Sequence, residues 1–195
     1  MSWYIHTRRG AFGGHGAPAG GFTLGWETPV QISTVGDSIV ETSGSLIEAV
    51  NLGETTNQTV NGVLFVAALT RDGLNSGSSD SSVLYTDGGV GASFESMLDS
   101  CAWYYSGTPT ARTITLSGLT SGKTYLLQVF VSDERFAGRA ESLSIAGHSY
   151  GPFEFNLSQS YVCRFIAGAT SATLTVTPNV YGVAQVHAFQ IRQLD

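Results

Sequence analysis

Charged side chains are scarce in this chain of 195 residues: Asp, Glu, Lys and Arg together make up 12%, and Lys123 is the sole lysine. The formal net charge is −6 at pH 7, and the only adjacent basic residues are Arg8 and Arg9. A nucleic-acid partner requires a clustered basic footprint, which this chain lacks. We therefore expect no nucleic-acid partner, and a surface covered mainly by hydroxyl and amide groups.

Long apolar runs are also missing, because no stretch approaches the roughly 20 residues that a membrane-spanning helix requires. The first residues, MSWYIHTRRGAFGGHG, lack the hydrophobic core of a signal peptide. We expect no membrane insertion, and a location outside the cell or on the surface of a particle. The chain would then be the mature part of a secreted protein, or a protein that leaves its host cell by another route.

Cysteine and histidine are few. Cys101 and Cys163 could form a disulfide or could be two buried thiols, and the sequence leaves both possibilities open. The four histidines show no spacing typical of a zinc site. His187 would share a strand face with Phe189 and Ile191, so we expect a hydrogen-bonded histidine at the edge of the core.

One short motif raises the question of catalysis. The stretch VGDSIVETSG, from Val35 to Gly44, is similar to the first block of the SGNH hydrolases, in which the serine is the nucleophile. That family places Asp-x-x-His near the C-terminus, but the residue three before His187 is Ala184, and no Asn-Asp pair supplies an oxyanion hole. A serine without an oriented base is a poor nucleophile. An esterase acting through Ser38 is therefore a remote alternative, and Gly36-Asp37-Ser38 is interpreted as a polar turn between strand-like segments 29–33 and 46–51.

Residues 1–21 differ in composition from the rest of the chain. They are aromatic and basic at first and then glycine-rich, in GAFGGHGAPAGG. Glycine loses the most backbone entropy on ordering, so this segment should not fold alone. We predict an extended N-terminal arm over residues 1–21 and one folded domain over residues 22–195.

From residue 22 onward, short segments of period two alternate with turn residues. In SATLTVTPN, the side chains of Ala172, Leu174 and Val176 share one face, which is typical of a strand with one buried face. RTITLSG repeats this pattern, whereas TYLLQVFVSD is apolar on both faces and indicates a central strand. Asn61-Gly62 lies between two β-prone runs and predicts a tight hairpin turn.

Only one segment has helical spacing. In SFESMLDSC, the residues Phe94, Met97, Leu98 and Cys101 recur at helical intervals after Ser93, a candidate N-cap. Many strands and one short helix predict an all-β fold, an antiparallel sandwich or barrel.

The order of these segments resembles a known type of domain. LIEAVNLG, TVNGVLF, GLTSGKTYLLQVFVSD, SYVCRFIAGATSATLTVTPN and QVHAFQIR follow one another as in a β-sandwich recurrent in secreted and surface proteins of planctomycetes and verrucomicrobia. That domain belongs to the galactose-binding-like jelly-roll superfamily, whose members include malectin and many carbohydrate-binding modules. The resemblance covers about residues 30–193 and implies an antiparallel jelly-roll sandwich without hydrolase activity. Glu48 departs from it, because the pattern usually has an aromatic or aliphatic residue there.

The resemblance also implies that a structural calcium ion is possible, since galactose-binding-like domains often hold one. Calcium requires six to eight oxygen ligands. The acidic residues of this chain are scattered and form no loop of the DxDxDG type. We therefore expect no metal site, with structural calcium as the alternative. We also expect no catalytic residue and no cofactor.

Two segments are candidates for binding a carbohydrate, which requires aromatic faces and a few planar polar groups. Alternation along Trp103-Tyr104-Tyr105 would put Trp103 and Tyr105 on one side and Tyr104 on the other, with at least one ring in the core. In the loop DERFAGR, the side chains of Asp133, Glu134, Arg135 and Arg139 could bind hydroxyl or carboxylate groups. The alternative for this loop is an internal Asp–Arg pair that fixes its conformation.

The sequence thus predicts a non-catalytic glycan-binding or adhesion module at a cell or particle surface. The alternative is a structural subunit of an ordered assembly, such as a virion or surface appendage. In that case Trp3, Tyr4 and Ile5 of the arm would contact an identical or different subunit. Glycines would let the arm follow its neighbour's surface.

Overall fold

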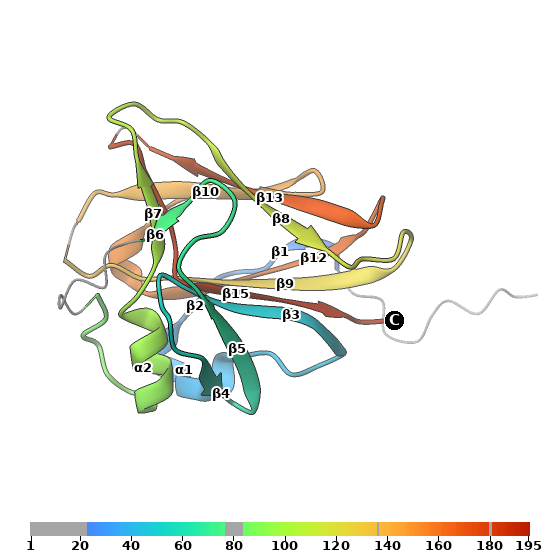
Figure 1. The fold of residues 1–195 in the computed structure, drawn as a ribbon, viewed down its shortest axis with the longest axis horizontal. Coiled ribbons are helices and arrows are strands. Elements are labelled where there is room, and N and C mark those ends of the chain that lie inside the picture. The colour runs from blue at the N-terminus through green and yellow to red at the C-terminus, as the bar shows by residue number, and fades with distance from the viewer. Residues whose placement is uncertain (1–22, 77–83, 136, 180) are drawn as a thin grey trace, which may run out of the picture.

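The computed structural model describes residues 23–76, 84–135, 137–179 and 181–195 (Figure 1). The predicted arm over residues 1–21 lies outside the described residues. The elements are, in chain order, β1 (Gly25–Trp26), β2 (Val30–Gln31), α1 (Ile32–Val35), the 3-10 helix η1 (Gly36–Ile39), β3 (Ser45–Leu52), β4 (Gln58–Val60), β5 (Val63–Ala68), β6 (Asn75–Ser76), α2 (Ala92–Leu98), β7 (Ala102–Tyr105), β8 (Arg112–Ser117), β9 (Thr124–Val131), β10 (Ala140–Ile145), β11 (His148–Glu154), the 3-10 helix η2 (Phe155–Leu157), β12 (Gln159–Ile166), β13 (Ser171–Pro178), β14 (Val183–Val186) and β15 (Ala188–Gln193).

The larger sheet has eight strands in the order β1-β12-β9-β15-β3-β5-β4, with β2 also paired to β12. A second sheet has the order β11-β10-β13-β8, and a small third sheet has the order β14-β7-β6. Figure 1 shows β10, β13 and β8 in a layer above β9, β15 and β3, with both α-helices below. The predicted all-β sandwich is therefore confirmed.

Apolar side chains cover both faces of the larger sheet. Leu127, Val129 and Phe189 belong to the core between the sheets, together with Leu174 and Val176 of β13. On the opposite face, the ring of Phe130 packs edge-on against Phe65 and Phe94, at centroid distances of 6.1 and 5.4 Å. Because β9 lies between β12 and β15 and is covered on both faces, its sequence is apolar on both faces, as the central-strand prediction requires.

Local patterns in the sequence identify several elements correctly. Leu174 and Val176 are buried and Ala172 packs against the same core. At the predicted hairpin, β4 and β5 pair with Val60 opposite Val63, and the intervening Asn61 and Gly62 have φ angles of 47° and 75°. Positive φ at both central residues is what a two-residue hairpin turn requires, so the hairpin prediction is confirmed.

The strand pairing and the helices differ from the prediction in two ways. β3 and β5 pair in parallel, whereas only antiparallel pairs were expected. The structure also contains two α-helices and two 3-10 helices among the described residues, where one short helix was expected. The GDS motif, expected as a polar turn that follows a strand over residues 29–33, lies in η1 and follows the helix α1. Ile32 and Ile39 on either side of the motif are buried in the same cluster as Phe130.

The predicted helix begins and ends earlier than expected. α2 spans Ala92–Leu98, its N-cap is Gly91 instead of Ser93, and Cys101 follows the helix. The backbone N–H groups of Phe94 and Glu95 both donate to the Gly91 carbonyl, so the first helical turn starts there. The Gly91 N–H donates to the Asp37 carboxylate at 2.7 Å, which joins η1 to the start of α2.

The unusual Glu48 of β3 is explained by an ion pair. The Arg71 guanidinium lies 3.0 Å from the Glu48 carboxylate and also donates to the Thr115 carbonyl at the edge of β8. A polar residue is tolerated at this half-buried position because it has a charged partner. No helix among the described residues is both long and apolar enough to cross a membrane.

Candidate functional site

The β7 strand presents two aromatic side chains to solvent. Trp103 is 37% exposed and Tyr105 is 60% exposed, whereas Tyr104 between them packs against the core. This is the alternation expected from the sequence. The three residues pair with Gln185, Ala184 and Val183 of β14, respectively. In a strand, residues i and i+2 point to the same face, so Trp103 and Tyr105 form one exposed aromatic pair.

Tyr104, on the opposite face of β7, packs against the core. The guanidinium carbon of Arg112 lies 3.2 Å from the centroid of the Tyr104 ring, a cation–π contact. β7 also pairs with β14 along its whole length, and with β6 at Ala102 and Trp103. The exposed pair therefore belongs to a fixed strand rather than to a loop.

A third exposed aromatic residue, Tyr181, was missed by the sequence reasoning. It is 55% exposed and follows β13 in the turn before β14. Its backbone N–H donates to the Asn179 side chain, whose amide nitrogen donates to the Gly138 carbonyl at 3.0 Å. A Cβ atom on Gly138 would lie 3.7 Å from the Tyr181 ring. The signal in the sequence was an aromatic residue in a turn, followed by a glycine.

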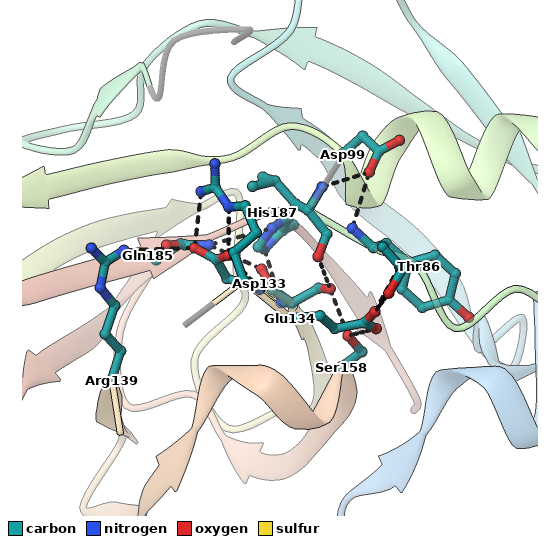
Figure 2. Close-up of polar contacts among 12 residues, drawn as sticks. Thr86, Asp99, Asp133, Glu134, Arg139, Ser158, Gln185 and His187 are labelled. Atoms are coloured by element: carbon teal, nitrogen blue, oxygen red, sulfur yellow. Dashed lines mark hydrogen bonds and ion pairs between the residues drawn. The ribbon is translucent and has the colours of Figure 1, made fainter. Parts of the chain in front are cut away.

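The loop between β9 and β10 contains an ion-pair cluster centred on Asp133 (Figure 2). Arg135 approaches both carboxylate oxygens of Asp133, with Nε–Oδ1 at 2.8 Å and Nη2–Oδ2 at 3.1 Å. The Nη1 atom of Arg139 lies 3.7 Å from Oδ2. The Asp133 side chain is 0% exposed, whereas the side chains of Arg135 and Arg139 are 33% and 30% exposed.

This cluster changes the expected role of Asp133. The sequence analysis placed Asp133 among the ligand-binding candidates, and the internal Asp–Arg pair was the alternative. The internal pair is the arrangement in the structure, and a fully buried carboxylate in this conformation cannot contact a ligand directly. Asp133 instead orients the two arginine side chains, which remain partly exposed.

Glu134, the next residue, points toward a different segment (Figure 2). Its carboxylate accepts hydrogen bonds from the Thr86 N–H at 2.7 Å, from the Thr86 hydroxyl and from the Ser158 hydroxyl at 2.7 Å. The Asp99 carboxylate accepts the backbone N–H groups of Leu84 and Tyr85 at 2.9 and 3.0 Å. The Glu134 bonds hold Thr86 against the β9–β10 loop, and the Asp99 bonds hold Leu84 and Tyr85 against the end of α2.

Buried polar side chains form a network next to the β9–β10 loop. The His187 Nδ1 accepts the Ser132 N–H at 3.1 Å, and burial lowers the pKa of His187 to about 3, so the ring is neutral. The expected hydrogen bond is present, but the ring is completely buried instead of lying at the edge of the core. The Gln185 N–H donates to Glu141 Oε2 at 2.9 Å, and burial raises the pKa of Glu141 well above its usual range.

Ser38 and His187 do not form a catalytic pair. The Ser38 hydroxyl is exposed on η1 and donates to the Val35 carbonyl at 2.9 Å. His187 is 0% exposed, and its Nδ1 is occupied by the Ser132 N–H. Within the part of the chain that the structure describes, the hydrogen bonds of Ser38 and His187 therefore do not join them into the nucleophile–base pair that this catalysis requires.

The two candidate segments come together at one end of the sandwich. Gln185 pairs with Trp103 and its side-chain amide donates to the Ser132 carbonyl, immediately before Asp133. Burial and the Asp133 charge raise the pKa of the Cys101 thiol, two residues before Trp103, while the Arg135 charge lowers it. We call this region the aromatic–arginine end, defined by Trp103, Tyr105, Tyr181, Arg135 and Arg139.

Other expectations are resolved only in part. Cys101 and Cys163 are two separate, buried thiols. Within residues 23–76, 84–135, 137–179 and 181–195, no three His, Cys, Asp or Glu side chains are grouped so that they could hold a metal ion. The possible structural calcium ion stays an open alternative. Trp3, Tyr4 and Ile5 lie outside the described residues, so their intersubunit role stays a prediction.

Comparison with known proteins identifies no family for this chain. No family model matches the chain, and no curated protein matches it. Two solved structures are similar: the C-terminal domain of EclA, described as a sugar-binding protein, with 19% identity and a TM-score of 0.37, and BtGH115A, described as a family GH115 4-O-methyl-α-glucuronidase with specificity for decorated arabinogalactans, with 12% identity and a TM-score of 0.34. The alignments cover 47% of this chain and 76% of the first, and 50% of this chain and 15% of the second. Neither similarity assigns a family or a function to this chain.

Proposed function

We propose that this protein is a non-catalytic glycan-binding module and that the aromatic–arginine end is its binding site. The observation that carries the proposal is the pair of exposed rings, Trp103 and Tyr105, on one face of β7, which pairs with β14 along its whole length and with β6 at Trp103. Aromatic faces pack against the C–H surfaces of sugars, and large exposed aromatic side chains that cluster are typical of interaction sites. A module of this kind acts where glycans are displayed, at the surface of a cell or particle.

Polar groups of the β9–β10 loop, which Gln185 joins to β7, support a sugar as the partner. Arg135 and Arg139 carry planar guanidinium groups that can donate paired hydrogen bonds to vicinal hydroxyls. Their orientation is fixed by Asp133, so less side-chain entropy is lost when a ligand binds. Tyr181 adds a third ring against Gly138, one residue before Arg139.

The state of the nearby carboxyl groups supports a role without catalysis. Glycoside hydrolysis requires a pair of carboxyl groups that reach the glycosidic bond. Asp133 and Glu141 are completely buried, and Glu134 accepts bonds from Thr86 and Ser158. None of these three residues offers an accessible acid or base at the exposed rings.

The proposal is tested on a glycan array followed by titration calorimetry of the best ligand. We expect Trp103→Ala and Tyr105→Ala each to weaken binding by ~30-fold, which corresponds to ~2 kcal/mol for a central aromatic contact. Leu64→Ala is the matched control, because Leu64 is 50% exposed on β5, away from the site. Absence of binding to every glycan, or equal binding by all four proteins, would remove the proposal.

The alternative function is a subunit of an ordered assembly that uses the N-terminal segment as an intersubunit arm. Its support is the composition of residues 1–21 and three apolar side chains on or just after β5 that are about half exposed, Leu64, Val66 and Leu69. Glycan binding does not require such contacts. Removal of residues 1–20 therefore discriminates between the two functions.

A further inference from the structure

The two exposed rings of β7 occupy successive positions along the strand. Trp103 and Tyr105 are two residues apart, so their backbones are ~6.6 Å apart along the strand axis. This separation is of the same order as the length of one sugar unit in an extended chain. A Cβ atom on Gly107 would lie 3.8 Å from the Tyr105 hydroxyl oxygen, so the Tyr105 side chain extends toward Gly107. Because one pyranose packs against one aromatic ring, the pair offers two adjacent positions for sugars.

The β14 side of this ring pair is closed. Gln185 and Val183 lie opposite Trp103 and Tyr105, and directly opposite residues of two antiparallel strands share a face. Gln185 and Val183 are nevertheless buried, with 2% and 6% exposure, whereas the two rings are exposed. The Gln185 side-chain amide donates to the Ser132 carbonyl, so the segment that follows β9 contributes to this cover. A ligand that lies flat on the rings therefore meets protein on the β14 side.

The surface that continues along the chain from β7 is open. Residues 107–111, just after β7, are all exposed. The Thr110 hydroxyl donates to the Thr108 carbonyl at 3.3 Å, so this loop is held in part by its own contacts. A Cβ atom on Gly182 would lie 3.2 Å from backbone atoms of Thr108, so the turn that carries the exposed Tyr181 packs against the same loop. The exposed surface thus continues from the ring pair to hydroxyl groups and a third aromatic residue.

We infer that the ring pair binds two successive sugars of one extended glycan chain, which runs along β7 with one sugar on Trp103 and the next on Tyr105. This inference rests on the proposed function and specifies its ligand class, the internal part of a chain instead of a single terminal sugar. A small ligand gains affinity where a pocket encloses most of its surface. A strand face that leaves the Tyr105 side chain 60% exposed does not enclose a single sugar, so affinity depends on contacts with several sugars in a row.

The test measures affinity as a function of chain length. The linear probes are β-1,4-linked oligosaccharides of glucose, xylose, mannose and N-acetylglucosamine, each as the methyl glycoside, the disaccharide and longer chains. The comparison probes are branched glycans that end in galactose, fucose or sialate. For at least one linear series we expect the affinity of the wild-type protein to rise about 30-fold from the methyl glycoside to the disaccharide, the same factor as for the loss of one ring.

Tyr105→Ala should remove this dependence on chain length, because it leaves only the Trp103 ring. The disaccharide should bind this variant about 30-fold more weakly than it binds the wild type, whereas the affinity for the methyl glycoside should stay within about 3-fold. Tyr105→Phe keeps the ring and should keep the dependence on length. A variant that was merely less stable would lose affinity for both probes by the same factor.

The outcomes separate this inference from the proposed function. A methyl glycoside that binds as tightly as its disaccharide, binding confined to the branched glycans, or an equal loss of both probes in Tyr105→Ala would overturn the two-sugar arrangement while glycan binding still stands. Binding to other glycans of the array but to none of the linear series would also overturn this inference alone. Absence of binding to every glycan of the array would overturn both.

Discussion

Trp103 and Gln185 lie directly opposite each other in the β7–β14 pair, and this relationship joins the two parts of the candidate site. The side-chain amide of Gln185 donates to the Ser132 carbonyl at 3.0 Å, and Asp133 follows in the chain. The backbone N–H of Gln185 donates to Glu141. A single buried residue therefore links the strand of the exposed rings to the loop of the exposed arginines.

The neutral His187 predicts a loss of stability in acid. Its pKa falls from 6.5 to about 3 on folding, so below pH 6.5 the unfolded chain binds a proton that the folded chain does not bind until about pH 3. The free energy of unfolding should fall across this window, by on the order of a few kcal/mol from this residue. His187→Gln cannot titrate, so the stability difference between wild type and variant, from urea unfolding, should shrink from pH 7 to pH 3. A constant difference would contradict a neutral buried ring.

The buried Glu141 predicts the opposite dependence on pH. Its pKa is raised well above 4.5, so as the pH rises past 4.5 the unfolded chain releases a proton that the folded chain keeps. The contribution of Glu141 to stability is present in acid and is lost as the pH rises toward its folded pKa. Glu141→Gln keeps a carbonyl acceptor for the Gln185 N–H and cannot ionise. We expect the variant to be close to wild type at pH 4 and more stable than wild type at pH 8; equal stabilities at pH 8 would show that the carboxyl is not held protonated.

The two cysteines should be unreactive in the folded protein. Burial raises the pKa of Cys163 to about 12 and also raises that of Cys101, and the thiolate is the reactive form. Ellman's reagent at pH 8 should therefore detect no thiol in native protein and two thiols per chain in guanidinium chloride. Detection of no thiol in denaturant without reductant would indicate a disulfide and contradict the free state of Cys101 and Cys163.

Removal of residues 1–20 should leave glycan affinity unchanged, because the proposed contacts all lie between Trp103 and Tyr181. A loss of affinity in the truncated protein would instead assign part of the site to the N-terminal segment. Light scattering on the same two proteins tests the assembly alternative. A larger mass for the full-length protein favours an intersubunit arm, and two monomers of equal stability contradict it.

Local patterns in the sequence were sufficient for much of the fold. Alternation in β13, the Asn61-Gly62 turn and the two-sided apolar character of β9 depend on neighbouring residues, and all three are found in the structure. The parallel β3–β5 pair was not predictable in this way, because period two reports the face of a side chain and not the partner strand.

The candidate site was predictable in composition but not in arrangement. Trp103, Tyr105, Arg135 and Arg139 were identified from residue type, and the structure has all four at least partly exposed. The burial of Asp133 and the position of Tyr181 depend on contacts between segments far apart in the chain. The Asp133 N–H donates to the Phe155 carbonyl, and Tyr181 lies against Gly138, which no local pattern encodes.

The central claim is that the exposed rings of β7 bind a sugar, and calorimetric titration of the best array glycan into wild-type protein and Trp103→Ala tests it most directly. The account predicts saturable binding by the wild type and a loss of about 30-fold in the variant, measured at a temperature where circular dichroism shows both proteins folded. Because Trp103 is only 37% exposed, the variant should also unfold at a lower temperature than the wild type. Equal affinities for the two folded proteins would contradict it.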